Sequence, residues 1–487
     1  MLNLLWFFFI PFAASLALFF SSRIPPKALK KFAFFLSLIP LAYLLYGGTG
    51  WIGSDLSYAW FTPASIQLHL HVDSLSFLFL ALTVALVPIS ILAVKSSKLT
   101  TPHVFYGLVL LLEGLLIGFF TAKDLALFTI FWESMLLPLY FIITLWGGNQ
   151  RQQSALKFLI YMFAGSVLMV AAVLALYFQS AAAGAATFNI DQLAAVSGIS
   201  SYSNWLFLIF LLAFAVKIPL FPFHGWLPDA YYQAPVAGTI LLSALLSKAG
   251  IYGIIRIGMG LFPQQLQEWS PFLLGLGIVG VFYGGFAAWR QQDYKRLIAY
   301  SSFSHVNFIL IGLFVWNQTA HSGAILQALN HGITITALFL VAGWLEERIG
   351  TTAMGSIGGL ARFMPHLCWL TLFFILSSVA LPGTNNFIGE FMILLGLFAT
   401  YPWATSFLCL SVILSVIYML RWMQKVYFEP PSFFQEAWID IRSREFLIAA
   451  PLIALVLWIG IYPASVLQEV TRASQTIISI ANAEKTQ

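Results

Sequence analysis

The chain has 487 residues, of which 60% are hydrophobic and only 8% are charged, and its mean hydropathy is +0.89. So few charged side chains cannot cover a water-exposed surface, which excludes a soluble globular protein. The net charge of +5 comes from basic residues scattered through short loops rather than gathered in one patch, which argues against a nucleic-acid partner. We expect these residues to orient the chain in a lipid bilayer.

Apolar runs recur along the whole chain at about the 20-residue length that a helix needs to cross a bilayer. The sequence therefore predicts an all-α polytopic membrane protein with about 14 transmembrane helices. The helices are expected near residues 3–20, 32–46, 75–94, 104–121, 125–145, 155–178, 204–218, 235–257, 271–289, 297–315, 321–344, 367–397 with an internal break, 403–424 and 446–467.

The first apolar run is predicted to be a retained helix rather than a cleaved signal peptide. No basic residue precedes it, and Arg23, Lys27, Lys30 and Lys31 follow it. With the N-terminus outside, most of the 23 lysines and arginines fall in inner loops. Both termini are thus predicted to lie on the outer side of the membrane.

Helices 7 and 12 are expected to break inside the membrane. Proline removes an amide donor and clashes with the preceding turn, so a helix that meets several prolines cannot continue. An ionisable residue beside such a break indicates an ion or proton path. The first break holds Pro219, Pro222 and Pro228 after Lys217, and the second holds Pro382, Gly383 and Gly389 before Glu390.

Paired breaks in two halves of a membrane protein are typical of an internal repeat. A five-helix unit crosses the membrane an odd number of times, so the second copy should be inverted. We expect helices 1–3 in residues 1–103, a first repeat of helices 4–8 in 104–257, the inverted repeat of helices 9–13 in 258–425, and helix 14 with a tail in 426–487. No long amphipathic helix is expected after residue 467.

Glu133 and Lys217 are predicted to form a pair inside the membrane. Glu133 lies well within helix 5 between apolar neighbours. At an assumed separation of about 7 Å and an effective dielectric constant of about 20, their attraction would be about 2.4 kcal/mol. Making or breaking the pair could load or release a proton. The alternatives are a neutral, hydrogen-bonded Glu133 and a Lys217 that extends to the interface.

Lys248, His305 and His331 are the next candidates for proton transfer. A buried lysine can alternate between ammonium and amine, or it can be held permanently by a carboxylate. The two histidines lie among serines, threonines and asparagines, and an imidazole can accept a proton on one nitrogen and release one from the other. Each histidine could instead be a satisfied core residue.

Four further residues complete the candidate site. Glu390 is a candidate exit acid or a solvent-facing loop residue. Glu113 is either functional or satisfied by a neighbouring helix that Gly114 admits. His224 and Asp229 could link the path to the inner surface, although Asp229 could simply cap a turn.

The sequence offers no sign of a redox centre or a nucleotide site. Gly48, Gly50 and Gly53 match G-x-G-x-x-G by chance, because no strand precedes them. Cys368 and Cys409 stand far apart in apolar surroundings, which indicates neither an iron–sulfur cluster nor a disulfide. No cofactor or metal is therefore expected in this chain.

Four segments resemble the antiporter-like membrane subunits of respiratory complex I, and most closely the branch called chain M in bacteria and chain 4 in mitochondria. The segments are FWESMLLPLYFII, FAVKIPLFPFHGWLPDAYYQAPVAGTILLSALLSKAGIYGIIR, DYKRLIAYSSFSHVNFIL and LPGTNNFIGEFMILLG. The resemblance spans helices 4–13, and Glu390 in place of lysine favours this branch. Asn385 and Asn386 depart from the more usual Ser and Gly, and Tyr231 and Tyr232 occupy a stretch where histidine is common.

The resemblance implies a 14-helix bundle with two inverted repeats that translocates protons while other subunits oxidise NADH and reduce quinone. It implies that Glu133 and Lys217 are the helix-5 and helix-7 partners, Lys248 the central lysine and Glu390 the terminal acid. FMN, iron–sulfur clusters and quinone are expected in other subunits. The implied partners are the bilayer and other membrane-arm subunits, including neighbouring antiporter-like ones, and the implied location is a bacterial inner membrane rather than an organellar one.

Two alternatives stay open. A subunit of a multi-subunit Na⁺/H⁺ antiporter or of a membrane-bound hydrogenase would carry the same motifs. A purely structural membrane spacer would use its buried charges only to lock helices together.

Overall fold

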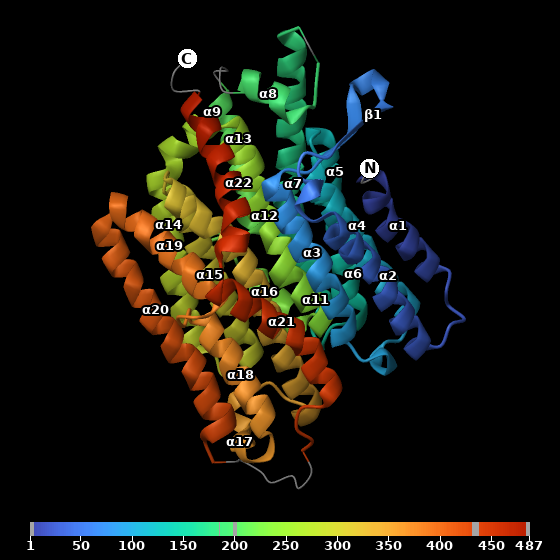
Figure 1. Ribbon diagram of the computed structural model, residues 1–487, viewed down its shortest axis with the longest axis vertical. Coiled ribbons are helices and arrows are strands. Elements are labelled where there is room, and N and C mark those ends of the chain that lie inside the picture. Colours follow the sequence, from blue (N-terminus) through green and yellow to red (C-terminus); the bar gives the residue numbers. More distant parts are fainter. Residues whose placement is uncertain (1–3, 185, 198–201, 431–437, 484–487) are drawn as a thin grey trace.

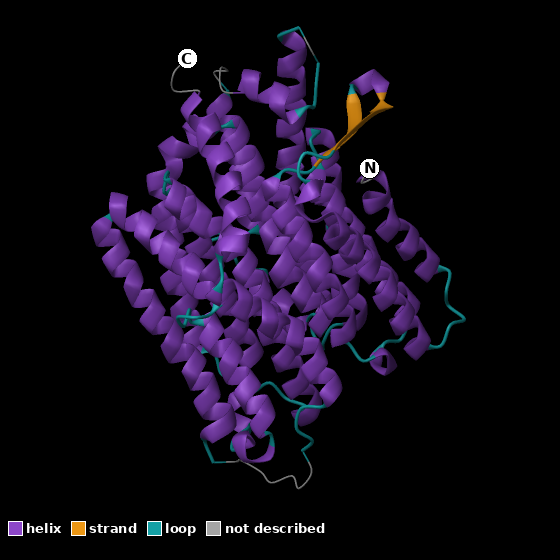
Figure 2. Ribbon diagram, in the orientation of Figure 1, coloured by secondary structure: helices purple, strands orange, loops and turns teal. Residues whose placement is uncertain are grey.

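The computed structural model describes residues 4–184, 186–197, 202–430 and 438–483, which form a helical bundle with one two-stranded hairpin (Figure 2). Eleven helices within these residues are long and apolar enough to cross a membrane, by length and composition. Four shorter apolar helices accompany them: α1 (Leu4–Phe19), α9 (Ser203–Lys217), α18 (Pro365–Ser378) and α19 (Asn385–Thr400). The all-α polytopic fold is confirmed, whereas the count of about 14 crossings stays a prediction.

The N-terminal half follows the expected order of apolar runs. The predicted helix 5 is split into two helices, because the ring of Pro138 clashes with the carbonyl of Ser134. The further elements of this half are α2 (Pro26–Gly47), η1 (Gly48–Trp51), β1 (Asp55–Phe61), η2 (Thr62–Ala64), β2 (Ile66–His71), α3 (Ser74–Ala93), η3 (Ser96–Lys98), α4 (Pro102–Thr121), α5 (Leu125–Ser134), α6 (Leu136–Trp146), α7 (Arg151–Ala182), α8 (Ile190–Ser197), α10 (Leu227–Gln233), α11 (Val236–Ile240), η4 (Leu241–Leu246), α12 (Ser247–Gly253), η5 (Ile254–Gly258) and α13 (Met259–Leu261).

The C-terminal half repeats the order of long helices with a broken helix in fourth place. The remaining elements are α14 (Pro263–Arg290), α15 (Tyr294–Phe314), α16 (Gln318–Ile349), η6 (Met354–Ser356), α17 (Leu360–Phe363), α20 (Pro402–Met423), η7 (Gln424–Phe428), α21 (Ser443–Ile461) and α22 (Ala464–Ala483). The division into repeats at residues 103, 257 and 425 and the inversion of the second copy stay predictions.

Both breaks lie where the prolines predict them, and they close in the same way. After α9, the amide of Leu220 donates to the carbonyl of Ala215, and after α18 the amide of Leu381 donates to the carbonyl of Leu376. The second break ends earlier in the chain than the sequence predicted. Gly389 was expected to interrupt helix 12, but it lies inside α19, so Glu390 follows a full turn of regular helix.

The hairpin of β1 and β2 was not expected. It extends from the end of the bundle near α1 and α7 (Figure 1). Asp55 accepts hydrogen bonds from His69 Nε2 and His71 Nδ1 at 3.0 and 3.1 Å, and the register places Asp55 opposite His71. These contacts hold the two strands together across their ends.

The expectation that no long amphipathic helix follows residue 467 was wrong. Pro463 separates α21 from α22, and α22 is a 20-residue helix. Its buried residues include Glu469, Val470, Ala473, Ser474 and Ile477, at the spacing of one helix face. Ser74 Oγ on α3 donates to Glu469 at 2.9 Å, and Gln318 Nε2 on α16 donates to the Thr471 carbonyl at 3.2 Å. This helix therefore ties α3 to α16.

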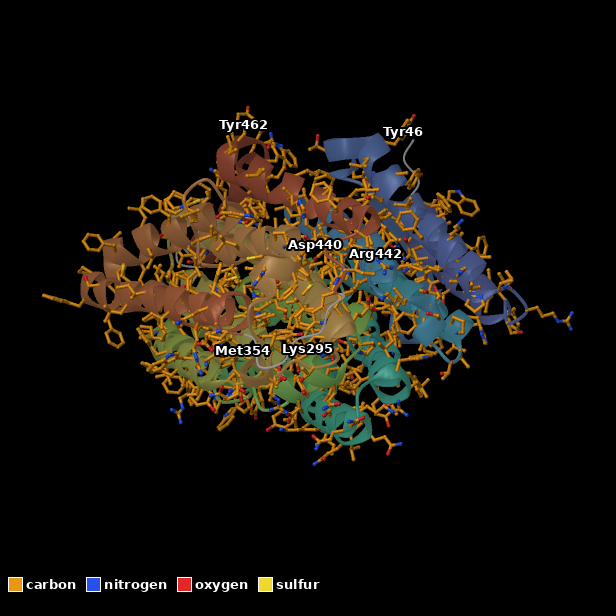
Figure 3. All side chains as sticks on the ribbon, turned by 90° about the horizontal axis from the view of Figure 1, so that it is seen from below. Tyr46, Lys295, Met354, Asp440, Arg442 and Tyr462 are labelled. Atoms are coloured by element: carbon orange, nitrogen blue, oxygen red, sulfur yellow. The ribbon has the colours of Figure 1, made fainter. Side chains whose placement is uncertain are left out.

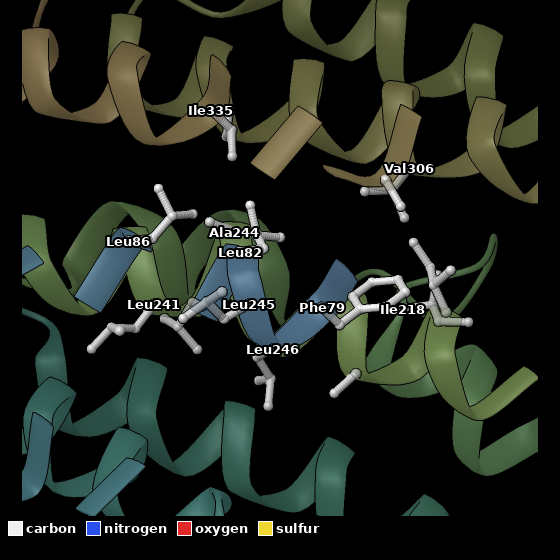
Figure 4. Close-up of a cluster of buried hydrophobic side chains, with 14 of the residues drawn as sticks. Phe79, Leu82, Leu86, Ile218, Leu241, Ala244, Leu245, Leu246, Val306 and Ile335 are labelled. Carbon is white, nitrogen blue, oxygen red and sulfur yellow. The ribbon is translucent and has the colours of Figure 1, made fainter. Parts of the chain in front are cut away.

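An apolar core lies between α3, η4, α15 and α16 (Figure 4). Phe79 and Leu82 of α3 face the π-helical turn η4, with Val306 and Ile335 on the opposite side. These side chains are almost fully buried and surround the middle of the bundle with hydrocarbon. Any charge beside them is held away from water.

The C-terminal end of α16 is fixed by three consecutive residues that pair with three different elements. Glu346 binds Lys295 of α15 at 3.2 Å, and Glu347 binds Lys95 after α3 at 2.7 Å. Arg348 forms an ion pair with Glu445 of α21. Figure 3 shows the bundle from below, with Lys295 near the middle of the view and Tyr46 and Tyr462 at its edge. The C-terminal end of α16 is thus anchored by three ion pairs.

Asp73 and Arg256 form an ion pair between the start of α3 and η5. Arg256 Nη1 and Nη2 lie 2.7 and 2.9 Å from the two carboxyl oxygens, and Nε lies 3.1 Å from the Tyr252 hydroxyl. Burial alone would raise the pKa of Asp73, but Arg256 and the Ser76 amide hold it well below its ordinary value of 3.8. The pair therefore stabilises the fold above pH 3.8, and this contribution is lost as the pH falls through the lowered pKa.

Replacing Asp73 with alanine is expected to destabilise the protein by about 2 kcal/mol, between the values for surface and buried pairs, because Asp73 keeps 29% of its side chain exposed. The thermal midpoint of the purified protein measures this loss. The matched control is Asp191→Ala, which breaks the exposed pair with Lys123 and should leave the midpoint nearly unchanged. Equal midpoints in the two variants would contradict the assignment.

Candidate functional site

Lys217 is buried at the end of α9, with only 1% of its surface exposed. Its Nζ donates to the Trp132 carbonyl at 2.9 Å and lies 3.4 Å from the centre of the Trp132 ring. The ammonium is therefore held by a backbone dipole and an aromatic face at the split between α5 and α6. The alternative in which Lys217 extends to the interface is therefore not met.

Glu133 and Lys217 are neighbours that do not touch. Their charges interact, but no ion pair within 4.0 Å joins them in the described residues. Glu133 Oε1 has no hydrogen-bond partner in the same residues. The carboxyl borders a cavity of about 660 Å³ between α5, α6 and α7, lined by Leu137 and Phe163 among others. The two groups can approach each other without first breaking a salt bridge.

Lys248 lies at the start of α12, directly after the π-helical turn η4. Its Nζ lies 2.8 Å from the Ser243 carbonyl, 3.2 Å from Ser247 Oγ and 2.6 Å from His331 Nδ1. π-helical turns often mark functional positions in helices. No carboxylate pairs with Lys248 in the part of the chain described here, so the alternative of a permanent lysine–carboxylate pair is not met.

His305 and Glu390 form the other end of the same polar line. His305 Nδ1 lies 3.1 Å from Glu390 Oε1, and Gln327 Nε2 donates to the same oxygen at 3.1 Å. Glu390 is only 5% exposed, which is inconsistent with a solvent-facing loop residue. A sequence separation of more than 80 residues is thus closed by contact between α15 and α19.

A small polar cavity separates the two histidines, whose ring centres are 6.1 Å apart. Its volume is about 10 Å³, which suits a single water molecule. Three of the polar atoms on its lining residues, His305 Nε2, His331 Nε2 and Ser302 Oγ, lack a hydrogen-bond partner in the described chain. Lys248, His331, His305 and Glu390 are therefore arranged in sequence along one line.

Side-chain amides hold the second break in place. Asn330 Nδ2 donates to the Asn385 carbonyl at 2.7 Å, and Asn386 Nδ2 donates to Thr334 Oγ1 and the Ser377 carbonyl at 2.9 Å each. Gln327 Nε2 also donates to Asn386 Oδ1 at 3.1 Å. The departures at Asn385 and Asn386 thus satisfy backbone and side-chain groups that the break would leave buried and unpaired.

The other three candidates lie apart from this line. Glu113 is fully buried, and neither carboxyl oxygen has a partner among the residues described. Gly114 admits Phe12 of α1, which is apolar, so that neighbour does not satisfy the acid. His224 packs against the rings of Phe303 and Tyr283, with centres 4.5 and 4.8 Å away.

Asp229 lies inside α10 and binds Lys157 of α7 at 2.8 Å and Arg296 of α15 at 3.3 Å. The residue at the N-cap position of α10 is Trp226. Asp229 therefore connects three helices rather than capping one, contrary to the simpler interpretation of the sequence.

Residues 122–417 match the family described as "NADH:quinone oxidoreductase/Mrp antiporter, TM". The chain belongs to this family. The matched region contains every candidate site residue except Glu113, and the resemblance to antiporter-like subunits seen in the sequence motifs is confirmed.

Curated relatives of the family resemble most of this chain. NADH-quinone oxidoreductase subunit M of Escherichia coli (strain K12) is 38% identical over 85% of this chain and 83% of its own length. The subunit M of Pseudomonas aeruginosa is 39% identical over 84% and 81%. NADH-ubiquinone oxidoreductase chain 4 of Chondrus crispus is 36% identical over 93% of both proteins.

Solved structures of the family share the fold. A chain of respiratory complex I from Thermus thermophilus with bound NADH matches with a TM-score of 0.89 and 29% identity, covering 98% of this chain and 100% of that chain. Chains of an archaeal membrane-bound sulfane sulfur reductase and of the Mrp complex from Dietzia sp. DQ12-45-1b match with TM-scores of 0.89 and 0.84. Both are 21% identical and cover 99% of each chain, so they show the fold alone.

Sequence reasoning missed three residues of the antiporter-like site. The partner of Lys217 is the Trp132 backbone, which no side-chain pattern can reveal. Gln327 looked like one polar residue among many, although its spacing of four residues from His331 places both on one face of α16. Ser243 contributes a backbone carbonyl, which becomes accessible only through the π-helical turn.

Replacing Gly389 with alanine is expected to displace Gln327 from Glu390, because a Cβ at this position would lie 2.4 Å from Gln327 Oε1. Glu390 would then lose one of two donors to Oε1, and its carboxyl band in infrared difference spectra should shift. Glu390→Gln identifies the band, and Gly260→Ala, with no atom within 4 Å, is the control. An unshifted band in Gly389→Ala would show that Gln327 does not influence the acid.

Proposed function

We propose that this chain is a proton-translocating membrane-arm subunit of an NADH:quinone oxidoreductase. The observation that carries the proposal is the order Lys248, His331, His305 and Glu390 inside an apolar bundle, with a small polar cavity between the two histidines. Membership of the family and relatives named as subunit M support it. The protein would be one part of a larger enzyme, with its chemistry limited to moving protons.

The histidines are suited to relay protons along this line. When His331 accepts a proton from Lys248 on Nδ1, its Nε2–H can release one toward the cavity, which leaves the imidazole neutral with its proton on Nδ1. A ring turn then restores the starting form. His305 can receive that proton and pass one to Glu390 across 3.1 Å. Each step moves one proton between named atoms and needs no redox partner.

Glu133 and Lys217 would control when this line is loaded. Lys217 is held by a neutral carbonyl and a ring, so a shift of its ammonium toward Glu133 exchanges one set of contacts for another of comparable strength. We propose that Glu113 is a further buried acid of the path, and that His224 and Asp229 lie on the inner side of the path. Protons would be taken up from inside, would load Lys248 and would leave through Glu390.

Uptake from the inner side is supported by a cavity of about 590 Å³ lined by Tyr232, Gln233 and Lys295. Tyr231, which precedes Tyr232 in the chain, is fully buried and lies beside Ser247, which contacts Lys248. A tyrosine hydroxyl can relay a proton where relatives more often carry histidine.

Redox chemistry is assigned to other subunits, which would hold FMN, iron–sulfur clusters and quinone. The partners would be neighbouring membrane-arm subunits in a bacterial inner membrane, with both termini of this chain on the outer side. Support for this orientation comes from the inner-side excess of lysine and arginine.

Lys217→Ala and Glu133→Ala are each expected to abolish NADH-driven proton translocation while the complex stays assembled, because each removes one charge of the controlling pair. Acidification of membrane vesicles measures translocation, and native electrophoresis measures assembly. Lys425→Ala, which breaks a partly exposed pair with Glu429, is the lysine control. Normal translocation in assembled Lys217→Ala would rule out the scheme, whereas loss of assembly would favour the structural-spacer alternative.

Mass spectrometry of the native complex in mild detergent is expected to find this chain with subunits that hold FMN and iron–sulfur clusters. The relatives named as NADH-quinone oxidoreductase subunits motivate this expectation. A complex made only of antiporter subunits, with sodium-dependent transport, would establish the Mrp-like alternative instead.

A further inference from the structure

Asn307 on α15 clamps the backbone of the first break. Its Nδ2 donates to the Pro219 carbonyl at 3.3 Å, and its Oδ1 accepts from the Phe221 amide at 3.4 Å. Both groups lie in the proline-rich stretch that follows Lys217, where no regular helix can satisfy them. Asn307 is fully buried and also donates to the Phe303 carbonyl of its own helix at 2.9 Å. One neutral side chain thus fixes the shape of the break.

The same helix holds the acid at the second break. His305 lies two residues before Asn307 and contacts Glu390 of α19. Successive residues of a helix are about 100° apart, so these two side chains leave α15 about 200° apart, on nearly opposite sides. One turn of α15 therefore contacts both broken helices at once.

Glycines of α14 leave room for this turn. A Cβ on Gly280 would lie 2.3 Å from Asn307 Oδ1, and one on Gly284 would lie 2.7 Å from the Phe303 ring. The amide can occupy its position between α14 and the first break only because residue 280 has no side chain. Close packing also allows a shift at the break to be passed to α15 instead of being absorbed by loose side chains.

We propose that α15 couples the two broken helices, with Asn307 as the positioning residue that transmits movement of the Lys217 break to the contact between His305 and Glu390. The coupling rests on the proposed function and adds to it a physical link between the controlling pair and the exit acid. A change in the charge state around Lys217 moves Pro219 and Phe221. Asn307 follows, and the turn that carries His305 rotates or shifts relative to Glu390.

The groups around the contact between His305 and Glu390 define what this movement can change. Gln327 and His331 face it from α16, and the Tyr418 hydroxyl of α20, bound to Ser301 at 3.1 Å, interacts electrostatically with Glu390. These groups belong to elements other than the first break. The most direct route from Asn307 to them runs along α15, which carries both Asn307 and His305.

The test uses Asn307→Leu and Asn307→Asp in the whole complex, in membrane vesicles. Both NADH oxidation and proton translocation are measured, and their ratio is the readout. Asn307→Leu removes the clamp and is expected to lower the number of protons moved per NADH by about twofold or more, with oxidation and assembly retained. A merely structural role would reduce assembled complex and both rates together and would leave the ratio unchanged.

Asn307→Asp adds a pH-dependent readout. The acid can donate to the Pro219 carbonyl only when protonated, so the ratio is expected to be low at alkaline pH and to recover as the pH falls. Gly280→Ala should lower the ratio by displacing Asn307, whereas Gly275→Ala on the same helix, with no atom within 4 Å of its Cβ, should not.

A native ratio in Asn307→Leu, or a loss in Asn307→Asp that is the same at every pH, would overturn the coupling. These outcomes leave the proposed function standing as long as Lys217→Ala abolishes translocation. If Lys217→Ala translocates protons normally, the proposed function itself is wrong.

Discussion

Every polar group that a helix break exposes inside the apolar bundle has to find a partner, and this requirement shapes the rest of the site. An unpaired backbone group in such surroundings costs several kcal/mol. Neutral amides supply most of the partners: Asn307 at the first break and Asn330, Asn386 and Gln327 at the second. The breaks are consequently held open without fixed charges, which leaves the lysines, histidines and acids free to change protonation.

Lys217 and Lys248 illustrate the consequence. Lys217 is bound by a carbonyl and a ring, and Lys248 by a carbonyl, a hydroxyl and an imidazole. Neither forms an ion pair with a carboxylate in the described chain, so gain or loss of a proton breaks no salt bridge. The ion pairs of Glu346, Glu347 and Arg348 lie instead at the C-terminal end of α16, where they fasten helices.

Much of the fold could be predicted because the bilayer simplifies the problem: apolar length identifies helices, and proline marks the breaks. The same reasoning identified Lys217, Lys248, His305, His331 and Glu390. It failed for the hairpin, because strand alternation over six or seven residues in a loop is a weak signal. It also failed for α22, whose apolar face is too narrow to read as a membrane span although its helical spacing was visible in the sequence.

The contacts within the site could be predicted less well than its members. Glu133 and Lys217 were expected to interact across about 7 Å. Their charges do interact, but the hydrogen bond from Lys217 to the Trp132 backbone was not predicted. Ser243 acts through its carbonyl in the π-helical turn, and Asn307 binds the backbone of the first break. Such roles depend on backbone geometry, which residue type and spacing do not encode.

The anchoring of α16 limits how its polar face can move. Its other end is held as well, because Gln318 binds α22. A rod supported at both ends can neither slide along its axis nor tilt as a whole. Opening or closing of the path beside Glu390 would then come from side chains between the two supports, such as Gln327, rather than from a shift of the whole helix.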